Sequence, residues 1–143
     1  MAYSTLTDLQ KLIPTASLVT LSNDTAGAVA VDQTNIDEAI DQADREIDAY
    51  LVIAGYSVPM DPVPPLVTNL SAKMAIWHLH LRKYFESKIW RDTYKDCQHL
   101  LGRIASGDLS IGMAVSGVAT AAGTGMVASS RTRKFTEEFM EQF

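Results

Sequence analysis

The sequence predicts an all-α protein: a small four-helix bundle of residues 1–107 followed by an extended C-terminal arm of residues 108–143. In Pro65–Lys83 some apolar residues recur every three or four positions along one helical face, and others fill much of the rest of the helix circumference. This pattern is typical of a buried central helix. Apolar stripes with the same period occur in the segments before and after it. After Asp108 the chain is rich in small residues and glycine, so this part has little apolar surface to bury.

The sequence of the N-terminal part predicts one short helix followed by a loop. The first helix is Ser4–Ile13, because Thr5 and Asp8 match a capping box and Pro14 ends the apolar pattern. Leu18–Val31 contains β-branched residues and turn signals, and we interpret it as a loop with marginal extended structure.

The second predicted helix begins near Asn35, which together with Glu38 can cap it, and it ends before Gly55. One face carries an apolar stripe, formed by Ile36, Ala39, Ile40, Ala43, Ile47, Tyr50 and Leu51. We expect the opposite face to be solvated and acidic, and its members are Asp37, Asp41, Asp44 and Asp48.

A proline-rich connector, Tyr56–Pro65, predicts a stiff crossing to the central helix. The fourth helix is predicted from an apolar stripe and ends at Gly107. The stripe consists of Trp90, Tyr94, Cys97, Leu101 and Ile104. We interpret Trp77 and Trp90 as core residues.

The sequence of the arm indicates a segment that docks on a partner and does not indicate a membrane span. Leu109–Ser130 has no charged residue and is long enough to cross a bilayer, but its Gly, Ala, Ser and Thr content is too weakly apolar for insertion. The sequence leaves open whether the arm is extended, a loose hairpin or disordered. At its end lie the basic and aromatic residues that we expect to bind a partner: Arg131, Arg133, Lys134, Phe135, Phe139 and Phe143.

Composition argues against several function classes. The net charge of -5 is unfavourable for a protein that grips nucleic acid, and a single cysteine excludes an internal disulfide. His78 and His80 point about 200° apart on a helix, and the ligand spacing of zinc sites is absent. Cys97 lies on an apolar stripe, where cysteine usually behaves as a small hydrophobe. We therefore expect no catalytic residues, no metal and no cofactor.

The run Asn35–Leu79 resembles the Mu-like bacteriophage family of small head-tail connector proteins. The residues that carry the resemblance here are Ile47, Asp48, Tyr50, Leu51, Tyr56, Val58, Pro59, Pro64, Ala72 and Ala75. Further matches are Tyr94, Leu100, Ile104, Ala105 and Gly107 at the fourth helix, and Arg133 and Phe135 near the end. The likeness covers most of residues 1–107.

The resemblance implies a structural role without catalysis, in a ring of about twelve copies between the portal and the tail. The expected partners are other copies of the chain, the portal protein and a stopper or tail-completion protein, with DNA only as non-specific cargo in the channel. The expected location is the virion, at the portal vertex, and the host cytoplasm before assembly. The four aspartates Asp37, Asp41, Asp44 and Asp48, which we call the acidic row, would face the channel and repel the phosphates of DNA. The alternative is a monomeric cytosolic module that recruits a partner through its phenylalanine-rich tail.

Overall fold

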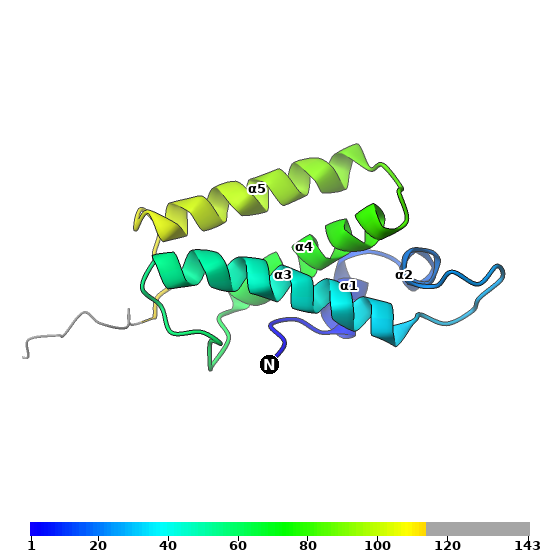
Figure 1. Cartoon of the computed structure of the whole chain (residues 1–143), viewed down its shortest axis with the longest axis horizontal. Helices are drawn as coiled ribbons and strands as arrows, with labels where there is room; N and C mark the ends of the chain where they lie inside the picture. The colour runs from blue at the N-terminus through cyan, green and yellow to red at the C-terminus, as the bar shows by residue number, and fades with distance from the viewer. Residues whose placement is uncertain (114–143) are drawn as a thin grey trace, which may run out of the picture.

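The computed structural model describes residues 1–113, which form five α-helices and, over that range, no strand (Figure 1). The helices are α1 (Leu6–Leu12), α2 (Thr15–Ser22), α3 (Gln33–Ile53), α4 (Pro65–Arg82) and α5 (Lys88–Ala105). The predicted all-α class is confirmed, with one helix more than the four expected. Most of the predicted arm lies outside the described residues.

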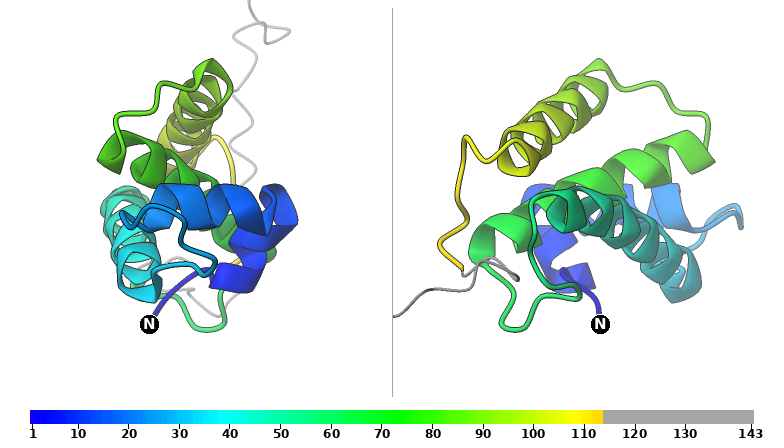
Figure 2. Two further views of the ribbon diagram at one scale, coloured as in Figure 1. Left: turned by 90° about the vertical axis from the view of Figure 1, so that its right-hand side faces the viewer. Right: turned by 60° about the vertical axis from the view of Figure 1, so that its left-hand side comes forward.

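Helix α4 is central, as predicted. It contacts each of the other four helices, with α3 and α5 on one side and α1 and α2 on the other (Figures 1 and 2). Its buried residues come from nearly every side of the helix: Val67, Leu70, Ser71, Ala72, Met74, Ala75, Ile76, His78 and Leu79. Within residues 1–113 no helix combines the length and apolar character that a membrane span requires.

The prediction of a loop at Leu18–Val31 is wrong for its first part, because Thr15–Ser22 is helical. Leu18 and Leu21 are buried against the core, and α2 contacts both α3 and α4. Burial of these two leucines outweighs the weak helix preference of the intervening Val19 and Thr20. The remainder of the segment is irregular, as expected.

The predicted capping box of α1 is confirmed, since the Thr5 amide donates to Asp8 at 2.9 Å. The predicted cap of α3 is wrong. Asp32 caps this helix by accepting from the amide nitrogens of Thr34 and Asn35, at 3.0 and 3.3 Å. Asn35 instead donates to the carbonyl of Ser22 at 2.7 Å, and thereby ties α3 to the end of α2.

Within residues 1–113, the ends of three helices are followed by a residue in the left-handed conformation. Gly55 after α3 and Gly107 after α5 have φ values of 87° and 83°, which glycine adopts without strain. Tyr84 occupies the corresponding position after α4, with φ of 56°. Its amide donates to Leu81 and the next amide donates to His80, both at 3.1 Å, which is the hydrogen-bond pattern of a Schellman motif.

Candidate functional site

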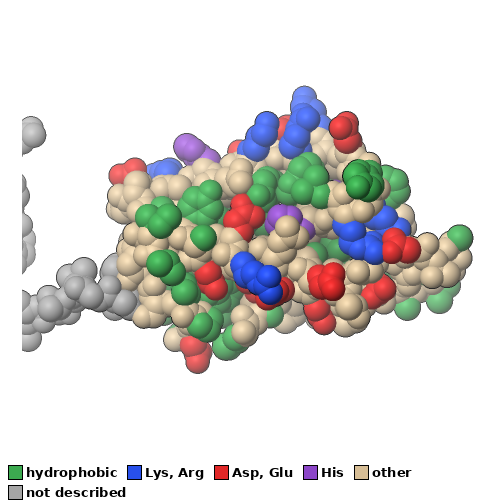
Figure 3. Space-filling model, viewed as in Figure 1, with side chains coloured by type: hydrophobic (Ala, Val, Ile, Leu, Met, Phe, Trp, Pro, Cys, Tyr) green, Lys and Arg blue, Asp and Glu red, His purple; other side chains and the backbone are tan. Residues whose placement is uncertain are grey.

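The acidic row of α3 is only partly a solvated face. Asp37 and Asp41 are exposed and Asp48 is half-buried, but Asp44 is only 6% exposed. Asp44 follows Ile40 by one turn and precedes Ile47 by almost one turn, so it borders the apolar stripe instead of lying opposite it. The expectation that all four aspartates share a solvent face is therefore wrong at Asp44. Figure 3 shows acidic side chains gathered over α3.

Asp44 is the centre of a buried polar network. Its Oδ2 accepts from the amide nitrogen of Tyr3 at 2.8 Å, and its Oδ1 accepts from the hydroxyl of Ser71 in α4. The Ser71 hydroxyl also pairs with that of Ser4 at 2.7 Å. Burial raises the pKa of Asp44, while the hydrogen bonds from Ser71 and Tyr3 oppose this rise. The network joins the N-terminal segment, α3 and α4.

Tyr3 extends this network to the proline-rich connector. Its hydroxyl donates to Asp48 and accepts from the amide of Met60, the latter at 3.1 Å. Burial and the hydrogen bond to Asp48 raise the pKa of Tyr3 above its ordinary value. Asp48 is therefore engaged in an internal contact, and the exposed acids of the predicted row are Asp37 and Asp41.

A second polar cluster joins α3, α4 and α5 around Glu46. Its Oε1 accepts from the Tyr94 hydroxyl at 2.6 Å and from Gln98 Nε2 at 3.2 Å. His78 Nε2 lies 3.5 Å from the other carboxylate oxygen, too long for a good hydrogen bond. Burial lowers the pKa of His78, and the nearby Glu46 charge opposes the shift. The hydrogen bonds of Glu46 with Tyr94 and Gln98 link α3 to α5, whereas both ring nitrogens of the buried His78 in α4 lack a hydrogen-bond partner.

Cys97 is 4% exposed and belongs to the core, as predicted. Burial raises the pKa of its thiol, which disfavours the thiolate that a nucleophile requires. Within residues 1–113 no group of three or more His, Cys, Asp or Glu side chains is placed to hold a metal ion.

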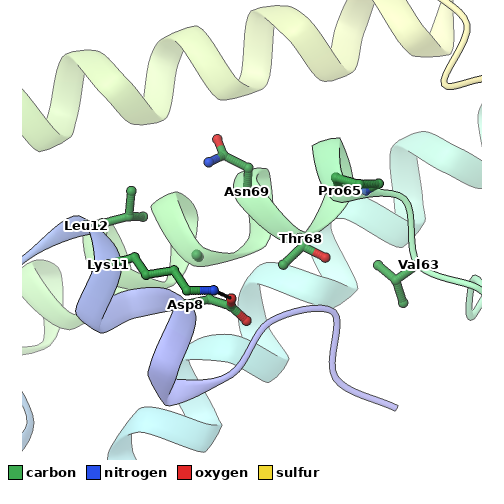
Figure 4. A pocket seen from close by; sticks show the side chains of 8 residues that line it. Asp8, Lys11, Leu12, Val63, Pro65, Thr68 and Asn69 are labelled. Atoms are coloured by element: carbon green, nitrogen blue, oxygen red, sulfur yellow. Dashed lines mark hydrogen bonds and ion pairs between the residues drawn. The ribbon is translucent and has the colours of Figure 1, made fainter.

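One pocket lies between α1 and the start of α4 and has a volume of about 380 Å³ (Figure 4). The ion pair between Lys11 and Asp8, 3.0 Å long, lies at its edge. This contact lowers the pKa of Asp8 and is satisfied within α1. Around it lie Leu12, Val63, Pro65, Thr68, Asn69 and Ala72.

A larger groove of about 510 Å³ lies at the corner where α4 turns into α5, and sequence reasoning missed it. We call it the corner groove; its lining residues are Trp77, His80, Leu81, Tyr84, Phe85, Glu86, Ser87, Lys88 and Arg91. Contrary to expectation, Trp77 and Trp90 are only half-buried, and Leu81 is 51% exposed. The signal in the sequence is a turn, 83–87, that contains two aromatic residues where polar residues and glycine are usual.

The predicted partner-binding residues lie outside the described residues. They are Arg131, Arg133, Lys134, Phe135, Phe139 and Phe143. The described surfaces that remain as candidates for binding are the exposed acids of α3 and the corner groove.

A comparison with curated proteins gives no match. A family model described as bacteriophage Mu, Gp36 matches residues 3–129, which include all five helices. This match confirms the Mu-like phage resemblance and indicates a structural or morphogenetic role. The chain belongs to the bacteriophage Mu Gp36 family.

Proposed function

We propose that this protein is a head-tail connector, a structural subunit that forms a ring between the portal and the tail or its stopper. The observation that carries the proposal is the family match, which spans residues 3–129. On this proposal the chain has no catalytic role. Its partners are other copies of itself, the portal protein and a stopper or tail-completion protein.

The hydrogen bonds that join the elements of the helical domain support such a role. Two polar networks, centred on Asp44 and Glu46, cross-link the N-terminal segment and three helices. The hydrogen bonds of these networks favour one arrangement of the elements that they join, although both ring nitrogens of His78 lack a hydrogen-bond partner. A ring subunit needs a fixed shape, because small errors in the angle between neighbours accumulate around a closed ring.

The charge of α3 supports a channel-facing position. Asp37 and Asp41 are exposed, and Glu38 lies between them on the same exposed part of the helix. A surface of negative charge repels phosphate and allows DNA to pass without binding. Asp44 does not contribute to this surface, since it is buried.

The test is a phage that carries an early stop codon in the gene for this chain. We expect DNA-containing heads that lack tails, and restoration of tailed particles when the intact chain is supplied from a plasmid. Electron microscopy of the lysate distinguishes the outcomes. Normal tailed particles without the chain would contradict the proposal.

A further inference from the structure

The corner groove exposes an unusual amount of apolar surface. Leu81, Tyr84 and Phe85 line it and are 51%, 94% and 52% exposed, and the neighbouring Ile89 is 76% exposed. Figure 3 shows apolar side chains at this end of the molecule, with basic side chains beside them. Apolar side chains that are contiguous and exposed in this way mark sites where another molecule binds.

The backbone at Tyr84 gives a second, independent indication. The left-handed conformation is strained for tyrosine, and the equivalent positions after α3 and α5 are glycine. The ring of Tyr84 is almost fully exposed, so it gains no packing within residues 1–113 that would compensate the strain. Residues in sparsely populated backbone conformations cluster at functional sites.

The chain itself contains a segment whose chemistry matches this groove. Phe135–Phe143 has three aromatic rings spaced by four residues, which share one face at helical spacing. On a helical projection of the sequence its three acids fall on the other side: they are Glu137, Glu138 and Glu141. Lys88 and Arg91 in the groove lining complement this charge, and Glu86 is the one acid there.

We infer that the corner groove of one copy binds the segment Phe135–Phe143 of a second copy. Phenylalanine rings would cover Leu81, Tyr84 and Phe85, while the glutamates would lie near Lys88 and Arg91. This is the groove recognition mode that amphipathic segments use, with apolar anchors at spacings of four. The inference rests on the proposed function in one respect, that copies of this chain contact one another.

The proposed ring, in which copies of the chain contact one another, favours a second copy over the chain's own segment. The corner groove is at the N-terminal end of α5, and the described chain leaves from the C-terminal end of this helix (Figure 1). With 18 residues, α5 separates the two ends by about 27 Å. A groove of one copy that binds a segment of the next copy makes a head-to-tail contact, the type of contact that closes into rings.

Disulfide trapping in the full chain tests the inference. All variants carry Cys97→Ala, so that the buried native thiol does not react. A chain with Leu81→Cys is mixed with a differently tagged chain that carries Phe139→Cys, and the mixture is oxidised mildly. The matched control replaces Leu81→Cys by Val52→Cys, because Val52 is similarly exposed, at 57%, and lies on α3 at the other end of the molecule.

Docking holds the two thiols at a high effective concentration, so we expect the mixed disulfide to form about tenfold faster with Leu81→Cys than with Val52→Cys. Adding Lys88→Glu and Arg91→Glu should remove most of this difference. Equal rates for the two positions would overturn the inference. It would also be overturned if one chain with both Leu81→Cys and Phe139→Cys cross-linked only within itself. Either failure leaves the stop-codon test of the proposed function unaffected.

Discussion

The buried carboxylate of Asp44 allows a quantitative test of how the fold is held together. Asp44→Ala removes the acceptor for the Tyr3 amide, and an unsatisfied buried amide costs about 1–3 kcal/mol. Ser71 also loses one hydrogen bond, worth about 1 kcal/mol, but keeps its contact with Ser4. Relief of the buried charge offsets part of this loss, so we expect a net destabilisation of about 2 kcal/mol.

Asp44→Asn separates the hydrogen bonds from the charge. Asparagine keeps an oxygen for the Tyr3 amide and can donate to Ser71, so most of the stability should be retained at pH 7. Because the pKa of Asp44 is raised in the folded state, folding takes up a proton just above the ordinary value of 3.8. Wild-type stability should therefore fall, relative to Asp44→Asn, as the pH rises through that range.

The assay is urea unfolding followed by helical circular dichroism, with Asp41→Ala as the control. Asp41 is exposed and pairs with Arg45 one turn later, a contact worth about 0.5 kcal/mol or less. If Asp44→Ala destabilised the protein no more than this control, the hydrogen-bond network around Asp44 would not stabilise the fold. If Asp44→Asn were as damaging as Asp44→Ala, the negative charge would stabilise the fold, which would contradict the raised pKa of Asp44.

Three further predictions concern single side chains. Tyr84→Gly should raise the free energy of unfolding by up to about 1 kcal/mol, because it relieves the left-handed strain; a loss of stability in urea unfolding would show that the ring packs within the chain. Burial lowers the pKa of His78 below 6.5, so stability should be fully present above pH 6.5 and decline as the pH falls below it. His78→Phe should flatten this decline, while His99→Gln, at an exposed position, should not. Equal dependence of stability on pH in the two variants would refute the assignment of the decline to His78. Cys97→Ala should cost about 1 kcal/mol of stability, and the native thiol should react with a thiol reagent far more slowly than the urea-unfolded one; equal reaction rates would contradict its burial.

Helical periodicity was sufficient to predict the central helix α4 and three of the helices packed against it, which are α1, α3 and α5. Pro65 at the start of α4 and Gly55 and Gly107 after α3 and α5 are local signals that act regardless of the rest of the fold. Helix α2 lacked such a signal. It forms because Leu18 and Leu21 are covered by helices that follow later in the chain, and no local pattern contains that information.

The candidate surfaces were harder to predict than the helices. Asp44 belongs by sequence spacing to the acidic row, and only the approach of the N-terminal segment and α4 buries it. The corner groove could not be predicted without the three-dimensional position of the turn after α4. From the sequence alone, Leu81 is expected to be a core residue of an apolar helix. The partner-binding segment at residues 131–143 stays a prediction, because it lies outside the described residues.

The connector role is tested most directly by quantitative mass spectrometry of purified phage particles from the source strain, with the chain counted against the portal protein. The account predicts that the chain is retained in finished particles at a near-equal ratio to the portal. Absence of the chain from particles that contain the portal would contradict it.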